Sequence, residues 1–94
     1  MVKTYFLLAP HLGLVKIGCS KDPLGRMADL RTMNAATVEP LCITRQPEAK
    51  VHAMFKRFRK HGEWFTISPS LVLYLLWLGE TEAAERIESL LQDV

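Results

Sequence analysis

Two short apolar segments near the start of the chain are separated by residues that favour a tight turn. Aromatic and aliphatic side chains dominate residues 3–8 and 14–18, and Pro10 and Gly13 lie between them. This pattern predicts an antiparallel β-hairpin. Side chains on paired strands project alternately to the two faces, so we expect Tyr5 and Lys16 to share a face. An ammonium group beside a phenol would lower the pKa of the phenol.

A helix and a third strand are expected after the hairpin. Ser20 or Asp22 can cap the helix, Pro23 suits its first turn, and the helix should end near Thr32. Residues 38–45 favour a strand, and Pro40 indicates that this strand lies at a sheet edge or starts late. The apolar face of the helix is expected to contain Leu24, Met27 and Leu30.

The segment from Glu48 to His61 has the apolar spacing of a second helix. Its stripe has the i, i+3, i+4, i+7 spacing, and Gly62 stands where a helix often ends on a left-handed residue. Residues 63–67 then form a short aromatic connector. The stripe consists of Val51, Met54, Phe55 and Phe58.

Two further helices are expected at the C-terminal end. Ser68 and Pro69 are a cap and a first-turn proline, and the run from Leu71 to Leu78 is apolar all round until Gly79 breaks it. Such a helix is either deeply buried or half of an interface. An amphipathic helix follows, with an apolar stripe of Ala83, Ala84, Ile87, Leu90 and Leu91.

Together these elements predict an α+β fold, with a small three-stranded antiparallel sheet flanked by helices and two short C-terminal helices. The 94 residues suit one domain, with a core at 3–68 and a helical extension at 69–94. No apolar run approaches the roughly 20 residues of a membrane-spanning helix, and no secretory leader is apparent. We therefore expect an intracellular protein whose Cys19 and Cys42 are reduced.

Charge is distributed unevenly along the chain. Eleven Lys and Arg face four Asp and Glu up to Gly62, whereas one Arg faces six acidic residues from Glu63 onward. A basic segment before an acidic tail suits a surface that meets a polyanion, and nucleic acid is the natural candidate. Segregation of ordinary solvated charges is the alternative.

Several short motifs occur in a fixed order along the chain. The first expected strand contains T-Y-F at positions 4–6, and the second contains V-K-I-G at 15–18. Arg26 follows, and then E-x-x-x-H-x-x-F at 48–55 and G-E-W-F at 62–65. In this order and spacing, over residues 3–68, the chain resembles the GIY-YIG endonuclease superfamily, and particularly its small phage and bacterial branch.

The resemblance implies a metal-dependent endonuclease that hydrolyses phosphodiester bonds of DNA with little sequence specificity. Glu63 falls at the family's metal-binding glutamate and would hold Mg²⁺ or Mn²⁺. Tyr5, or a water that it orients, would activate the nucleophile, while Arg26 stabilises charge on the phosphoryl oxygens. Lys16 would lower the pKa of the phenol or contact phosphate, and His52 would act as a general base or hydrogen-bond the nucleophile.

Exposed cations are the candidates for contacts to the nucleic-acid backbone, which position a substrate without reading its bases. The chain has no room for a separate DNA-reading domain, so targeting would come from a partner protein or be absent. The host would be a bacterial or phage-infected cell, with the protein in its cytoplasm. The candidate nucleic-acid-binding residues are Lys21, Lys56, Arg57, Arg59 and Lys60.

The chain departs from the family pattern at two places, and other interpretations stay open. Lys16 replaces the second signature tyrosine, and no asparagine follows Glu63. His52 is otherwise read as a helix histidine satisfied by a backbone carbonyl, and Glu63 as a solvated turn residue. A catalytically inactive module that binds nucleic acid or a protein is the alternative function. The run from Leu71 to Leu78 and the last helix could instead form a homodimer interface.

Overall fold

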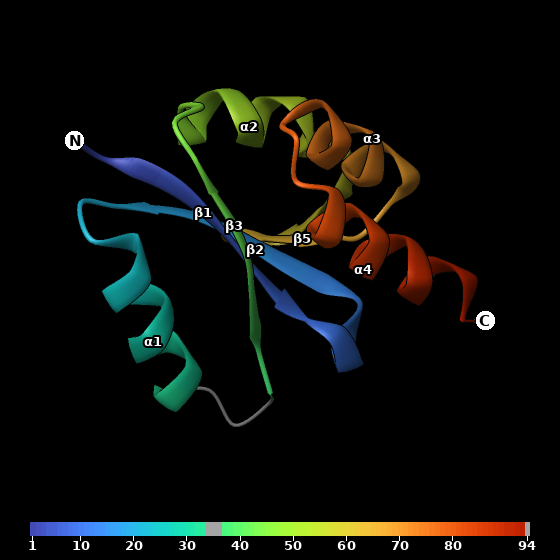
Figure 1. Ribbon diagram of the computed structural model, residues 1–94, viewed down its shortest axis with the longest axis horizontal. Helices are drawn as coiled ribbons and strands as arrows, with labels where there is room; N and C mark the ends of the chain where they lie inside the picture. The colour runs from blue at the N-terminus through green and yellow to red at the C-terminus, as the bar shows by residue number, and fades with distance from the viewer. Residues whose placement is uncertain (34–36, 94) are drawn as a thin grey trace.

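A five-stranded antiparallel sheet with helices on both faces organises the chain (Figure 1). The structure is a computed structural model that describes residues 1–33 and 37–93. The elements are β1 (Lys3–Ala9), the 3-10 turn η1 (Pro10–Leu12), β2 (Leu14–Ser20), α1 (Pro23–Met33), β3 (Glu39–Thr44), α2 (Glu48–Met54), the 3-10 turn η2 (Lys56–Phe58), β4 (Arg59–His61), β5 (Trp64–Thr66), α3 (Pro69–Trp77) and α4 (Thr81–Gln92).

The predicted hairpin is confirmed in position. β1 pairs with β2 so that Tyr5 opposes Gly18 and Leu7 opposes Lys16. Opposed residues share a face and alternate residues return to it, so Tyr5 and Lys16 lie on the same face as expected. β3 is the sheet edge that Pro40 predicts, and its pairing with β1 is irregular between Phe6 and Leu7.

Each face of the sheet carries its own apolar core. On one face Tyr5 and Leu7 pack with Met27 and Leu30 of α1. On the other face Phe6, Leu8, Val15 and Ile17 pack with residues of α2, α3 and α4. Alternation along β1 and β2 thus supplies both cores. Leu24, expected on the buried face of α1, is 70% exposed, because the contacts of α1 with the sheet begin one turn later at Met27.

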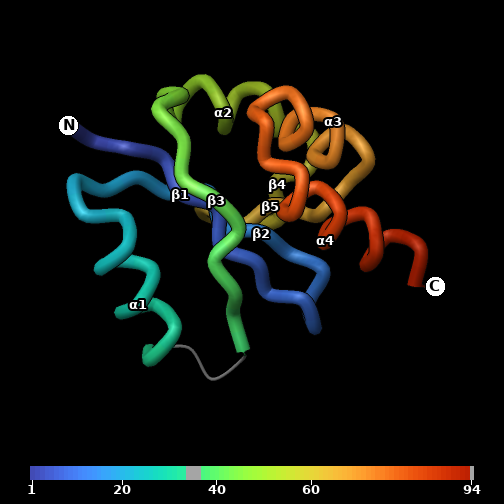
Figure 2. The backbone as a smooth tube through the Cα atoms, in the orientation of Figure 1, coloured from blue at the N-terminus to red at the C-terminus, as the bar shows by residue number. Residues whose placement is uncertain are grey.

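The sheet contains five strands, not the expected three. The helix predicted to run to His61 ends at Met54, and the residues that follow form β4 and β5 in place of the end of a helix and an aromatic connector. α2 ends at Met54, and β4 and β5 form a second hairpin that joins β2 (Figure 2). Gly62 has a φ of 55° and forms the hairpin turn instead of ending a helix. Phe55 and Phe58 lie outside the helix but still pack on the core, because the 3-10 turn directs both side chains toward it. Their spacing therefore matches that of a helix although the backbone is not α-helical.

Two packed helices complete the fold as predicted. Ser68 caps α3, its Oγ accepting from the amide of Leu71 at 3.3 Å. α3 buries one side, including Leu71 and Leu75, against α4 and the sheet, but it leaves Leu73 and Trp77 each 68% exposed. The run is therefore only partly buried within this chain. Within residues 1–33 and 37–93, no helix is long and apolar enough to cross a membrane.

Candidate functional site

Three potential metal ligands converge beside the edge of β2. Glu48 and His52 stand four residues apart and therefore on the same side of α2, and Glu63 comes from the turn between β4 and β5. One ligand atom from each of the three side chains lies within 4.8 Å of the others. β5 pairs with β2 only at residues 14–16, so the last part of β2 is left uncovered by β5 at this point.

His52 is fixed by the backbone of β2. Its Nε2 lies 2.7 Å from the carbonyl oxygen of Ile17, and its ring packs 5.0 Å from that of Phe65. A carbonyl only accepts, so Nε2 carries the proton and donates, and in the neutral ring Nδ1 carries the lone pair. This contact matches the structural alternative stated for His52. It is also how proteins orient a metal-binding histidine, so it leaves both roles available.

Glu48 belongs to the cluster although sequence reasoning did not select it as a site residue. Its Oε2 is buried without a hydrogen-bond partner among the described residues. An unpartnered buried carboxylate oxygen is costly unless a cation or a solvent molecule satisfies it. The two carboxylates suit Mg²⁺ or Mn²⁺, whereas imidazole is a ligand of transition-metal ions, so the set as a whole fits Mn²⁺ better than Mg²⁺, and the orphaned oxygen adds to that fit. The helical E-x-x-x-H spacing at 48–52 was the available signal.

Glu63 is held at the cluster by Lys16. The Lys16 Nζ lies 3.0 Å from Oε1 of Glu63, and the same ammonium lies 5.6 Å from the centre of the Trp64 ring. The Glu63 backbone carbonyl also accepts from the amide of Ile17 at 2.9 Å. Glu63 is consequently tied to β2 at two points, so it is not the freely solvated turn residue of the alternative interpretation.

Tyr5 lies on the opposite face of β1 from Phe6, with only 2% of its surface exposed. Burial is the main cause that raises the pKa of its phenol, and the charges of Glu63 and Glu48 raise it further. A hydrogen bond with Arg26 acts in the opposite sense. The prediction that Lys16 lowers this pKa was wrong, because the Lys16 ammonium is paired with Glu63 and the cation beside the phenol is Arg26.

Arg26 reaches Tyr5 from the exposed side of α1. Gly25, beside it, is explained by the start of the helix, because the Gly25 amide donates to Oδ1 of Asp22 at 3.2 Å. A Cβ at Gly25 would overlap that carboxylate. Asp22 therefore caps α1, and its amide in turn donates to the Ser20 hydroxyl at 3.0 Å.

The five predicted catalytic residues thus form one connected group with Glu48. Glu48, His52 and Glu63 make up the carboxylate–imidazole cluster, and Lys16 pairs with Glu63. The charges of Glu63 and Glu48 raise the pKa of the Tyr5 phenol, and the charge of Arg26 lowers it. Residues from α1 on one face and α2 on the other therefore meet at the uncovered edge of β2.

The predicted nucleic-acid-binding residues are exposed, and four of them directly precede Glu63 in sequence. Because α2 ends at Met54, this basic run lies outside the helix and its charges do not serve as partners of a helix C-terminus. Arg59 donates from Nε to the Gly62 carbonyl at 2.8 Å, and the Arg57 guanidinium lies 5.6 Å from the Phe58 ring centre. Lys21 follows directly after β2. The other four residues lie on η2 and β4, and they are Lys56, Arg57, Arg59 and Lys60.

The fold and this cluster define a small α+β domain with a carboxylate–imidazole site beside the end of β2. Residues 4–77 match the T5orf172 domain, and the chain belongs to that family. The match includes α3 and so extends past the expected core boundary at residue 68. The family is phage-associated and related to nuclease-type domains. No curated protein and no solved structure shows significant similarity to the chain.

Proposed function

We propose that this protein is a metal-dependent endonuclease of the GIY-YIG type that hydrolyses phosphodiester bonds of DNA with little sequence specificity. The observation that carries the proposal is the convergence of Glu48, His52 and Glu63 within 4.8 Å. The membership of a family related to nuclease-type domains and the motifs at 4–6, 15–18 and 62–65 support it.

Glu48, His52 and Glu63 would hold the divalent cation, Mg²⁺ or Mn²⁺. When bound, the ion polarises a phosphoryl oxygen and lowers the pKa of a bound water. Glu63 thereby keeps the metal role that the family resemblance implies, and Glu48 joins it as a second carboxylate. His52 would bind through Nδ1, since Nε2 is occupied by the carbonyl of Ile17.

The remaining site residues act on the substrate and on water. The Arg26 guanidinium stabilises negative charge on the phosphoryl oxygens, and its exposure leaves it accessible to a strand. Tyr5 keeps its proton at neutral pH, because the ordinary pKa of a phenol is already near 10 and burial raises it further, so its hydroxyl orients a water instead of acting as a phenolate base. Lys16 positions Glu63 and can turn to a phosphate.

Nucleic acid is favoured as the substrate by the charge around the site. The basic run 56–60 leads directly into the turn that carries Glu63, and Lys21 follows the uncovered part of β2. Contacts of this kind go to phosphates and carry no base information. Low sequence specificity follows, with targeting supplied by a partner protein or absent.

Cleavage of supercoiled plasmid DNA with Mg²⁺ or Mn²⁺ tests the proposal. The wild type is expected to nick the plasmid, and Glu63→Ala and Glu48→Gln are expected to lower the rate at least about a hundredfold, since a metal ion supplies several kcal/mol of transition-state stabilisation. Glu85→Gln, an exposed acid on α4, is the matched control and should cleave like the wild type. A wild type that leaves plasmid intact with every metal contradicts the proposal.

A catalytically inactive module that binds nucleic acid is the second candidate. The observation in its favour is the raised pKa of Tyr5 together with Lys16 at the position of the second signature tyrosine. This function predicts retardation of plasmid on a gel, weakening steeply with salt, without any cleavage.

A further inference from the structure

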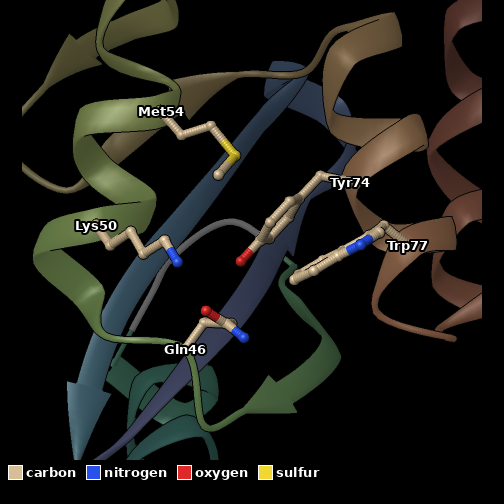
Figure 3. Close-up of a pocket in the computed structure, with 5 residues that line it drawn as sticks. All are labelled: Gln46, Lys50, Met54, Tyr74 and Trp77. Carbon is tan, nitrogen blue, oxygen red and sulfur yellow. The ribbon is translucent and has the colours of Figure 1, made fainter.

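A second concave surface lies between α2 and α3. Two adjoining hollows of about 220 and 400 Å³ share Met54 and Tyr74 as common walls. Figure 3 shows the smaller one, with Lys50 and Met54 projecting from α2 toward Tyr74 and Trp77 of α3. Gln46, just before α2, lines the lower side of the hollow in this view. The hollow therefore combines aromatic faces, a thioether, an amide and an ammonium.

The aromatic part of the hollow is a stacked pair of rings, of which Tyr74 is buried and Trp77 is exposed to solvent. The Tyr74 and Trp77 ring centres lie 5.8 Å apart with an interplanar angle of 26°. Tyr74 is 8% exposed and packs edge-on against Phe55, whereas Trp77 is 68% exposed. An indole supported from behind and open in front is a surface on which another flat ring can stack.

The charge around the two hollows has one sign. Lys50 lines one and Arg57 lines the other, and no acidic side chain lines either of them among residues 1–33 and 37–93. The grooves elsewhere differ, since the one between α3 and α4 includes Glu88 and the one beside β3 includes Glu39. Flat apolar faces flanked by cations match a nucleobase flanked by phosphates.

We propose that this surface binds an unpaired nucleotide of a nucleic-acid strand, with the base stacked on Trp77 and the flanking phosphates contacting Lys50 and Arg57. Gln46 offers an amide that can donate to and accept from the edge of the base. The inference rests on the proposed function for the class of partner, nucleic acid, and narrows it to substrates that contain a single-stranded segment or a displaced base.

The position on α2 links this surface to the candidate metal site. Lys50 and Met54 are four residues apart, as are Glu48 and His52, and the two pairs are offset by two residues. An offset of two residues is about 200° around a helix, so the pairs occupy opposite sides of α2. A strand that crosses α2 can therefore place one nucleotide at Trp77 and a phosphate at the metal site.

Binding of labelled oligonucleotides, followed by fluorescence anisotropy in EDTA to prevent cleavage, tests the inference. The probes are a short single-stranded DNA, an RNA strand of the same sequence and the blunt DNA duplex. Trp77→Ala is expected to weaken binding of the single strands by at least about fivefold, as loss of one base–aromatic stack does. Trp77→Phe should restore most of it. Leu76→Ala, next in sequence, exposed on α3 and lining neither hollow, is the matched control and should bind like the wild type.

The outcomes separate this inference from the proposed function. Preferential loss of single-strand binding in Trp77→Ala, with DNA, RNA or both, supports the surface and shows which strand it takes. Equal binding by wild type, Trp77→Ala and Leu76→Ala overturns the inference, while the proposed cleavage of plasmid can still stand. A wild type that binds the duplex but neither single strand overturns it as well. If the protein neither binds any probe nor cleaves plasmid, both proposals fail.

Discussion

The phenol ring of Tyr5 lies directly over Gly18 on the neighbouring strand, at the end of β2 where the candidate site begins. A Cβ at position 18 would overlap both the hydroxyl oxygen and the ring carbon of Tyr5 that bears it. The ring has little room to move, because Tyr5 is only 2% exposed. The missing side chain of Gly18 therefore creates the position that Tyr5 occupies.

Gly18→Ala is expected to destabilise the protein by about 1–3 kcal/mol, as overpacking a buried site does. Chemical unfolding of the wild type, Gly18→Ala, Tyr5→Leu and the double variant measures the coupling between the two positions. In the double variant the alanine should cost much less than it does alone. A neutral or stabilising Gly18→Ala, the usual result of removing a strand glycine, would mean that the Tyr5 ring moves aside.

Two substitutions of His52 separate its hydrogen bond to the Ile17 carbonyl from its proposed role in metal binding. His52→Gln keeps an N–H donor for the Ile17 carbonyl but loses the ring nitrogen, so stability should stay near that of the wild type while DNA cleavage is lost. His52→Ala should in addition lower the free energy of unfolding by about 1–3 kcal/mol, because the carbonyl loses its partner. Unfolding curves and plasmid assays on the same preparations decide it. Full cleavage by His52→Gln would leave His52 with the structural role alone.

The sequence was sufficient for the parts of the fold that have strong local signals. The turn residues between the first two apolar segments predict the hairpin, and alternation along it places Tyr5 and Lys16 on one face. Pro40 marks the edge strand. The strands β4 and β5 were not predicted, because each has only three residues and Phe58 extends a helical spacing. Gly62 was ambiguous, since helix ends and hairpin turns both use a left-handed glycine.

The sequence predicts which residues form the candidate site better than it predicts which of them contact one another. The motifs selected Tyr5, Lys16, Arg26, His52 and Glu63, but nothing in them shows that Lys16 pairs with Glu63 and not with the phenol. That pairing depends on the unpredicted β4–β5 hairpin, which brings Glu63 to β2. Glu48 was overlooked because an acid in the first turn of a helix is ordinary.

The last helix is fastened to the sheet edge by a bidentate ion pair that should respond to pH. Arg86 donates to both carboxylate oxygens of Glu39, at 2.8 and 3.2 Å. The hydrogen bonds with Arg86 hold the pKa of Glu39 below its ordinary value near 4.5. The lowered pKa means that the pair stabilises the fold above that ordinary value and is lost as the pH falls through the lowered one.

Arg86→Gln is expected to destabilise the fold only slightly at neutral pH, since both side chains are more than a third exposed and solvent screens the pair. Unfolding measured at neutral pH and below pH 4, with Glu39→Gln as the companion variant, checks this. The difference between wild type and Arg86→Gln should shrink in acid. A difference that stays constant across this range would assign the effect to packing of the arginine and not to charge.

The two cysteines should differ in reactivity. Cys42 is buried in the core between β3 and the C-terminal helices, and burial raises its pKa to about 12. Cys19 is exposed, although partial desolvation and the charge of Glu48 also raise its pKa. A thiol reagent at neutral pH should therefore label Cys19 slowly and Cys42 only after denaturation, as peptide mass spectrometry can show. Equal labelling of the native protein would contradict the packing around Cys42.

Calorimetric titration of Mn²⁺ tests the central claim, that Glu48, His52 and Glu63 form one ion site, most directly. The wild type is expected to bind one ion per chain, and Glu48→Gln and Glu63→Gln should each weaken binding by at least about tenfold, while Glu85→Gln leaves it unchanged. Absence of Mn²⁺ binding by the wild type, or equal binding by all four proteins, would contradict the account.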